Sequence, residues 1–327
     1  MSLDVLTFGE ALVEVMRAER DVPFDVPGTF LGPYPSGAPF IFAVQAARLG
    51  AKAGSLGCVG AKSDGTPDAF GKCLLDQLVQ DGVETRCVLA LPGYTTGVAF
   101  IAYDSSGGRD YVFHLRHAAA GQLDPALLEL PAVDGLFEGL KCLHLTGSSL
   151  SINAGALALG RALLEKAQSV GAKISFDPNF RPQLLDLEQA QAAFAPFIAA
   201  ADVILPTAEE AMLLIGESTA EGAGAALAAG KVGRVVVISE GERGCTVYSA
   251  SETGHVPGFA VEEVDPTGAG DCFDAGFLVR WLAGDPPLNA ARYANACGAL
   301  AVTVRGPMTG AQRSEIIEAF MKGQHPS

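Results

Sequence analysis

The alternation of apolar and polar segments predicts a chain in which short strands are followed by helices. Val5 to Phe8 is a brief apolar run that stops at Gly9. Comparable apolar runs recur and are separated by alanine-rich segments: strands at 142–145, 174–176, 203–205 and 235–238, and helices near 153–170, 188–200 and 220–229. This alternation favours right-handed βαβ units and a mostly parallel sheet flanked by helices, so the predicted fold class is α/β.

A different pattern occupies the first third of the chain. Residues 98–103 and 109–116 are two β-rich runs on either side of a turn at 104–108, which predicts a hairpin. On the second strand, a period of two places Tyr111, Phe113 and Leu115 on one face and His114 and Arg116 on the other. Residues 17–35 are rich in proline, glycine and charge, so we expect them to be irregular or to form part of a lid.

The length allows one large α/β domain or two smaller ones, and we expect a single domain over residues 1–327; the hairpin before the βαβ region suggests a small β lid. The lid is expected from segments of about residues 12–35 and 95–118. A β lid with an exposed edge can pair with another subunit, so a homodimer through the lid is one arrangement that the pattern allows.

Composition limits the partners. The 327 residues include 22 Lys and Arg against 37 Asp and Glu, for a net charge of −15, which argues against nucleic acid or an anionic membrane. No basic leader and no apolar run of membrane-spanning length is present, and the seven cysteines include no C-x-x-C pair. We therefore expect a reduced, cytoplasmic protein.

The most informative stretch is residues 264–273. It reads as an extended segment, a turn of small residues and a helix whose apolar face carries Phe273, Phe277 and Trp281. A helix N-terminus with glycines offers free backbone amides to an anion such as phosphate, and its field should keep Asp271 ionised as a proton acceptor. The alternative is a glycine-rich turn in which Asp271 only assists the start of the helix.

This stretch also carries a family resemblance. Residues 265–271, Asp-Pro-Thr-Gly-Ala-Gly-Asp, resemble the C-terminal signature Asp-Thr-Thr-Gly-Ala-Gly-Asp of the ribokinase-like carbohydrate kinases, the PfkB family; Pro266 is a departure. The resemblance implies a ribokinase-like fold, an ATP-dependent sugar kinase using Mg²⁺, and Asp271 as catalytic base. It further implies that Gly268, Ala269 and Gly270 form the anion hole and that a monovalent cation such as K⁺ lies near Asp265.

The N-terminal region matches the family with exceptions. Glu14 occupies the position of a family Asp that contacts substrate hydroxyls; the alternative is a solvated acid at a strand end. Gly37 and Ala38 lie in a segment similar to the family's Gly-Gly-Ala-x-x-Asn signature, which implies that they contact the sugar. Ser36 replaces the first glycine, and Ile41 replaces the Asn that usually hydrogen-bonds the sugar.

Residues 177–181, Asp-Pro-Asn-Phe-Arg, resemble a string found in 2-keto-3-deoxygluconate kinases and fructokinases. In the former group, this arginine and one from the lid approach the substrate carboxylate, which implies that role for Arg181 and Arg116. Guanidinium recognises carboxylate in a fork, so the chemistry is consistent. The alternatives are that Arg181 pairs with a structural acid and that Arg116 faces solvent.

The nucleotide side carries weaker motifs. Thr207 to Glu210 resembles the family's Asn-x-x-Glu motif, in which the Glu positions Mg²⁺ largely through water; Thr207 and Glu210 also fit a capping box. Three residues, Ser239, Gly241 and Gly244, resemble the Gly-x-x-Gly turn beside the nucleotide. Asn295 lies on a helix that often lines the family's adenine pocket, or is simply a surface residue of that helix.

The predicted reaction is therefore transfer of the ATP γ-phosphoryl group to a primary hydroxyl of a small sugar or sugar acid. No Gly-x-x-x-x-Gly-Lys-Ser/Thr loop or protein-kinase motif set is present, which leaves the Asp-plus-anion-hole design. Arg116 and Arg181 favour 2-keto-3-deoxygluconate as substrate. The alternatives are fructose or another neutral ketose, then a nucleoside, and a non-catalytic sugar sensor.

Overall fold

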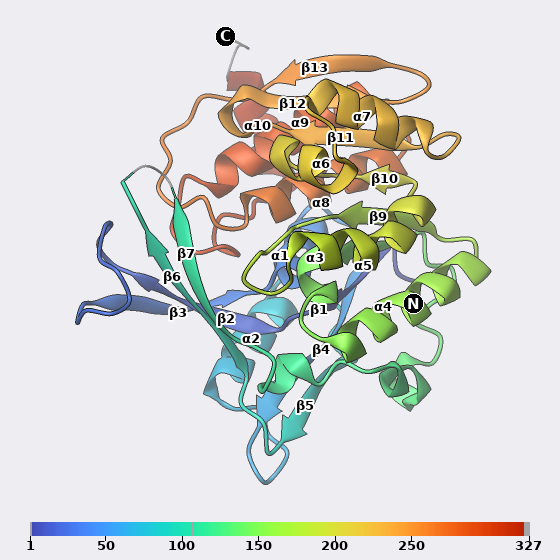
Figure 1. Cartoon of the computed structure of the whole chain (residues 1–327). Coiled ribbons are helices and arrows are strands. Elements are labelled where there is room, and N and C mark those ends of the chain that lie inside the picture. Colours follow the sequence, from blue (N-terminus) through green and yellow to red (C-terminus); the bar gives the residue numbers. More distant parts are fainter. Residues whose placement is uncertain (1, 106–107, 324–327) are drawn as a thin grey trace.

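The larger of two β-sheets organises the chain. The structure, a computed structural model, describes residues 2–105 and 108–323, so the hairpin turn residues Ser106 and Gly107 lie outside the described part. The large sheet has nine strands in the order β13-β12-β11-β10-β9-β8-β1-β4-β5 (Figure 1). Its strands are β1 (Val5–Gly9), β4 (Ala53–Ala61), β5 (Val88–Pro92), β8 (Cys142–Thr146), β9 (Lys173–Asp177), β10 (Val203–Ile204), β11 (Val235–Ser239), β12 (Gly244–Tyr248) and β13 (Thr253–Pro257). Neighbouring strands of this order are parallel, except that β11 and β12, and β12 and β13, are antiparallel.

Helices cover both faces of this sheet. The longer ones are α1 (Ala38–Arg48), α2 (Ala69–Gln80), α4 (Ala154–Ser169), α5 (Leu187–Ala200), α6 (Ala208–Ile215), α7 (Ala220–Ala229), α8 (Ala269–Leu282), α9 (Pro287–Ala301) and α10 (Ser314–Gly323), with the short α3 (Gly147–Leu150). Successive residues of a strand point to opposite faces, so Val5 joins the core beneath α1, α8 and α9, whereas Leu6 joins the core beneath α4 and α5. The predicted strands and helices of the βαβ region are all present.

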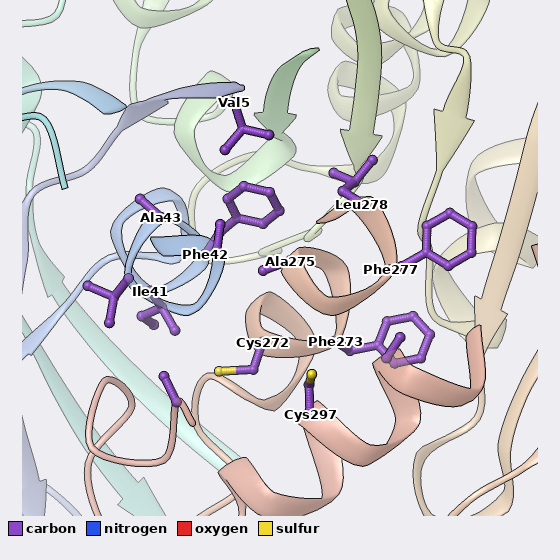
Figure 2. Close-up of a cluster of buried hydrophobic side chains, with 14 of the residues drawn as sticks. Val5, Ile41, Phe42, Ala43, Cys272, Phe273, Ala275, Phe277, Leu278 and Cys297 are labelled. Atoms are coloured by element: carbon purple, nitrogen blue, oxygen red, sulfur yellow. The ribbon is translucent and has the colours of Figure 1, made fainter. Parts of the chain in front are cut away.

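The core between α1 and α8 positions the turn at residues 265–270 that leads into α8. Figure 2 shows Ile41 and Phe42 of α1 facing Cys272 and Ala275 of α8. Burying apolar area of this kind contributes about 25 cal/mol per Å². The N-terminus of α8 is thereby held beside α1 at the edge of the sheet.

A separate small sheet, in the order β3-β2-β6-β7, accounts for the predicted β lid. Its strands are β2 (Leu12–Arg17), β3 (Phe30–Ser36), β6 (Gly97–Tyr103) and β7 (Arg109–His114). The β6–β7 hairpin is antiparallel as predicted. Of the two alternatives for residues 17–35, irregular or lid-like, the segment from Phe30 onward is not irregular, because it forms β3 and pairs with β2 in the small sheet. An edge strand tolerates Pro33 and Pro35, since one of its sides needs no donors.

Within residues 2–105 and 108–323, no helix is long and apolar enough to cross a membrane.

Candidate active site

A cavity lies between the small sheet and the ends of β1, β8 and β9. Glu10 follows β1, Ser148 follows β8, and Asn179 and Arg181 follow β9. The opposite wall comes from the small sheet, and α8 contributes its N-terminus with Gly268 and Asp271. This is the carboxyl edge of the parallel strands, where ligands of such sheets bind.

The turn into α8 has the geometry of an anion site. Gly268 precedes the helix with φ 81°, and a Cβ there would lie 3.1 Å from Pro307 and 3.2 Å from Ile41. Glycine is therefore required both by the backbone and by the space. The Cys272 amide donates to Gly268 O at 3.0 Å, which leaves the preceding amides of Ala269 and Gly270 in the unpaired first turn.

Asp271 is buried beside these amides. It is 8% exposed, and its Oδ1 has no hydrogen-bond partner among the described residues. Burial raises the pKa of Asp271 to about 7, and the nearby charge of Arg181 opposes that shift. The helix field was expected to keep Asp271 ionised; burial opposes that effect and raises the pKa of Asp271.

Two further carboxyl groups face the cavity. Glu14 is 6% exposed, so the alternative of a solvated strand-end acid is wrong. Ser36 Oγ donates to Glu14 Oε1 at 2.6 Å, and burial raises the pKa of Glu14 to about 8. Glu10, which the sequence analysis did not single out, accepts from Ser148 and Ser149 at 2.8 and 2.6 Å. Burial also raises the pKa of Glu10.

Gly37 and Ala38 also line the cavity, at the start of α1. A Cβ at Gly37 would lie 2.0 Å from the Glu10 carbonyl oxygen, so this position admits only glycine. Ile41 presents an apolar wall where the family signature has Asn.

The arginines of the cavity are only partly those expected. Arg181 lines the cavity, and its guanidinium carbon lies 6.0 Å from the centre of the Tyr111 ring. Arg116 lies outside the lining: its Nε donates to Ile152 O at 3.1 Å and its Nη2 to Leu184 O at 2.8 Å. The assignment of Arg116 to the substrate carboxylate is corrected on this ground, because β7 ends at His114 and the chain turns away.

Arg109 takes the place expected of Arg116. It begins β7 and lines the cavity together with Tyr111, Phe113 and Leu115. The period of two that grouped those three residues also includes position 109, so the signal was present in the sequence. No described carboxylate lies within ion-pair distance of Arg109 or Arg181.

The Thr207–Glu210 capping box is present. Thr207 Oγ1 accepts from the Glu210 amide at 3.2 Å, and Glu210 Oε2 accepts from the Thr207 amide at 2.9 Å. Glu210 Oε1 accepts from the Phe180 amide at 2.7 Å, which ties α6 to the 177–181 segment. Asp177 lies nearby; burial raises its pKa, and the charge of Glu210 adds to that shift.

The donor set suits Mg²⁺ only in part. Across the described ranges, no group of three or more His, Cys, Asp or Glu residues is placed to hold a metal ion. Mg²⁺ commonly keeps several waters and binds substrate phosphates with one or two carboxylates. Both oxygens of Glu210 and both oxygens of Asp177 already accept hydrogen bonds within the protein, so these two residues would hold a Mg²⁺ ion through water and not directly.

A second hollow lies beside the glycine turn after β11. Ser239 ends β11, and Gly241 and Gly244 have φ of 61° and 97°, which only glycine adopts readily. The hollow is lined by Glu242, Arg243, His255, Pro257, Gly258 and Ala260. Asn295 is buried, and its Nδ2 donates to Val256 O and Pro257 O at 3.0 and 3.1 Å, so the alternative of a surface residue is wrong.

Asp265 does not present a free oxygen to a cation. Its Oδ1 accepts from Tyr103 and from the Thr267 amide, and its Oδ2 accepts from the Gly306 amide. The placement of a monovalent cation beside Asp265 stays a prediction.

Comparisons with known proteins identify the family of this chain. Residues 3–313 match the family described as pfkB family carbohydrate kinase. The protein named Probable fructokinase-4 of Arabidopsis thaliana is 30% identical over 98% of this chain and 97% of its own length. An E. coli protein provisionally named ribokinase II, solved with ATP and Mg²⁺, is 38% identical with a TM-score of 0.88, covering 99% and 100% of the two chains. A double mutant of Vibrio cholerae O395 fructokinase, solved with fructose, ADP and potassium, is 28% identical with a TM-score of 0.83 and 98% coverage of both chains.

Proposed function

Because this chain belongs to the PfkB family of carbohydrate kinases, we propose that it transfers the γ-phosphoryl group of ATP to a primary hydroxyl of a ketose, with fructose as the first candidate. The observation that carries the proposal is Asp271: its unpartnered Oδ1 lies in the cavity at the N-terminus of α8. Among the relatives, those named fructokinases favour fructose over the sugar acid.

The proposed chemistry follows from this arrangement. Asp271 takes the proton of the attacking hydroxyl, while the amides of Gly268, Ala269 and Gly270 stabilise charge on the transferring group. Glu10 and Glu14 accept hydrogen bonds from other sugar hydroxyls, beside Gly37 and Ala38. Mg²⁺, held through water by Glu210 and Asp177, supplies positive charge to the phosphates when bound.

The nucleotide is proposed to lie across the second hollow. The turn of Ser239, Gly241 and Gly244 lies beside this hollow, and Asn295 donates to Val256 O at the β13 wall; we propose that these residues and Thr207 contact the nucleotide. The small sheet covers the sugar cavity, so we propose that it acts as a lid on a single domain. The Vibrio fructokinase structure contains a potassium ion, and we propose a monovalent cation such as K⁺ near Asp265 in this chain as well.

A specific observation favours a second candidate, 2-keto-3-deoxygluconate. Arg109 and Arg181 both line the cavity, and neither has a described carboxylate partner. Guanidinium groups that have no described carboxylate partner can bind a substrate carboxylate in a fork, although Arg181 Nη1 also donates to Phe180 O at 3.1 Å. The nucleoside alternative is supported only by Ile41, and the sensor alternative is opposed by family membership and by Asp271.

The experiment compares ATP turnover with fructose and with 2-keto-3-deoxygluconate. Wild type, Arg181→Ala and Arg109→Ala are assayed with each sugar, and Arg116→Ala serves as the matched control outside the cavity. If wild type prefers fructose, and Arg181→Ala and Arg109→Ala change the turnover of both sugars alike, the first candidate is supported. Preference for the acid, lost in both cavity variants and kept in the control, supports the second candidate. Absence of sugar-dependent ATP turnover contradicts both.

A homodimer through the small sheet also stays a proposal. Phe30 on β3 and Val112 on β7, the two edge strands, are 38% and 49% exposed. Light scattering on wild type and on Val112→Lys tests it, since a charge on the edge should disfavour pairing.

A further inference from the structure

Tyr103 joins two parts of the chain that are far apart in sequence. It is the last residue of β6, in the small sheet. Its hydroxyl donates to Asp265 Oδ1 at 2.8 Å and lies 2.6 Å from Thr267 Oγ1. Since the tyrosine proton goes to Asp265, the Thr267 hydroxyl supplies the second hydrogen bond. Burial and the charge of Asp265 raise the pKa of Tyr103, so this hydroxyl stays protonated as a donor.

Asp265 is the junction of three segments. Besides Tyr103, it accepts from the Thr267 amide at 3.0 Å and from the Gly306 amide at 2.8 Å. It is 3% exposed, so these are hydrogen bonds to a desolvated carboxyl group, which are among the stronger ones in proteins. Thr267 immediately precedes Gly268, so the Asp265 contacts set where the turn into α8 lies.

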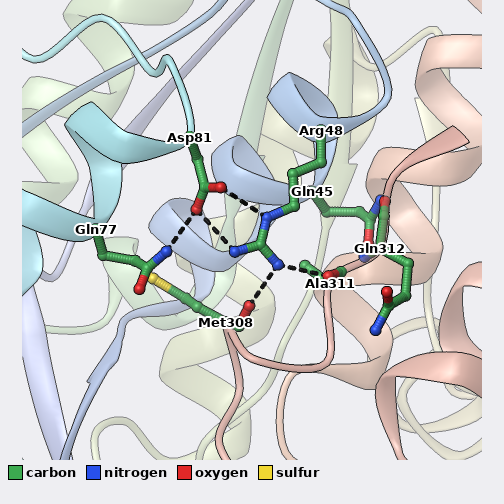
Figure 3. A network of polar contacts seen from close by, with 7 residues as sticks. All are labelled: Gln45, Arg48, Gln77, Asp81, Met308, Ala311 and Gln312. Atoms are coloured by element: carbon green, nitrogen blue, oxygen red, sulfur yellow. Dashed lines mark hydrogen bonds and ion pairs between the residues drawn. The ribbon is translucent and has the colours of Figure 1, made fainter.

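The Gly306 side of the junction is anchored independently. Figure 3 shows Arg48 of α1 contacting Asp81 at the end of α2 and the carbonyls of Met308 and Ala311. Gln45 and Gln312 form a reciprocal pair beside it, at 2.8 and 2.9 Å. The loop after α9 is therefore fixed to α1 and α2. The partner of Asp265 that comes from the small sheet is Tyr103.

The small sheet connects Tyr103 to the sugar cavity. Tyr103 pairs with Arg109 across the β6–β7 hairpin, and Arg109 lines the cavity. Ala99, on the same strand as Tyr103, lines it too. A shift of the small sheet relative to the bound sugar would therefore move the Tyr103 hydroxyl relative to Asp265.

We propose that Tyr103 is a positioning residue for phosphoryl transfer. Its hydrogen bond to Asp265 couples the position of the small sheet over the sugar to the position of the Gly268–Gly270 amides. This inference rests on the proposed phosphoryl transfer but not on the identity of the sugar. A displacement of about 1 Å in such donors can cost about 100-fold in rate. The coupling makes the anion hole complete only when the small sheet is in place.

The test is Tyr103→Phe, which keeps the ring and removes only the hydroxyl. Tyr94→Phe is the matched control, because Tyr94 is 40% exposed and lies outside the cavity lining. We expect kcat to fall about tenfold or more in Tyr103→Phe, as for loss of a hydrogen bond to a charged acceptor, with KM for sugar and ATP within about twofold. Amide hydrogen exchange in residues 264–271 should become about threefold faster or more, in the absence of ligands.

Each outcome decides the proposal. A lower melting temperature with unchanged kcat and unchanged exchange in residues 264–271 overturns it, since that pattern is a structural role alone. Equal effects in Tyr94→Phe overturn it as well. If wild type turns over no sugar, the proposed function fails, and the exchange measurement alone then decides whether Tyr103 holds the turn.

Discussion

Ser36 and Glu14 form a 2.6 Å hydrogen bond between neighbouring strands of the small sheet. Both residues are departures from the family pattern: the serine replaces a glycine and the glutamate replaces an aspartate. The two departures therefore complement one another. The serine supplies a donor to a longer, buried carboxyl group that has no other described partner on Oε1.

Removing this donor should weaken sugar binding. In Ser36→Ala, the pKa of Glu14 rises further above its value of about 8, because the hydrogen bond from Ser36 favours the ionised form. Ionised Glu14 is the better acceptor of sugar hydroxyls, so KM for the sugar should fall as pH rises through about 8. We expect a KM about tenfold higher in Ser36→Ala at pH 8, with Ser36→Thr near wild type. An unchanged KM across pH 7–9 would show that Glu14 does not contact the sugar.

The pH dependence of stability reports on Asp271. The folded-state pKa of Asp271 is about 7, above its ordinary 3.8, so folding favours its protonated form. That stabilisation is fully present below pH 3.8 and is lost as pH rises to about 7. The side chain of Asp271→Asn cannot ionise, so the variant does not lose this stabilisation. The difference in unfolding free energy, variant minus wild type, should therefore rise by about 1.4 kcal/mol per pH unit across that window and stay constant above it. Denaturant titrations at pH 5, 6, 7 and 8 measure this; a constant difference contradicts the raised pKa.

Arg116 should matter for stability and not for the substrate. Its side chain donates to the carbonyls of Ile152, between α3 and α4, and Leu184, after β9, which ties the end of β7 to both segments. We expect Arg116→Ala to lower the unfolding free energy by about 1 kcal/mol, since the residue is largely exposed. The KM for fructose and for 2-keto-3-deoxygluconate should change by less than about twofold. A selective rise in KM for the acid would restore Arg116 to the substrate site.

Breaking the Arg48–Asp81 pair should lower the free energy of unfolding more than the loss of the Arg116 side chain does. The Asp81 side chain is 3% exposed and the Arg48 side chain 14%, and Arg48 also holds the loop of Met308 and Ala311. Leaving a buried carboxylate unpaired costs about 3 kcal/mol or more, so Arg48→Ala should be strongly destabilised in a thermal melt. Arg48→Lys should recover little, because lysine lacks the fork that contacts Asp81 and both carbonyls. Near-complete recovery by lysine would contradict the fork geometry.

Local patterns allowed much of the site to be predicted. The Gly268–Asp271 turn and the Thr207–Glu210 capping box are formed by residues a few positions apart, so sequence spacing determines them. The roles of Glu10 and Asp265 depend on partners more than 130 and 160 residues away, Ser148 and Tyr103, and spacing carries no information on such contacts.

The predictions for Arg116 and Asp271 differ from the structure, the first because a strand ends early and the second because of burial. Arg116 was extrapolated from a strand that ends at His114, whereas Arg109 shares the cavity face through the same period of two. Asp271 was expected to stay ionised in the field of the helix, whereas its pKa also depends on how deeply the fold buries it. The antiparallel pair β12 and β13 was not predicted, because the alternation of strands and helices indicates only parallel strands.

The most direct test of the central claim is the turnover number of Asp271→Asn with ATP and the preferred sugar. We expect kcat to fall about 10²–10⁴-fold, the range for loss of a general base, with little change in KM for sugar or ATP. Wild type should lose activity as pH falls below about 7, where Asp271 takes up a proton. A variant whose kcat stays within tenfold of wild type would contradict Asp271 as the base and the proposed mechanism with it.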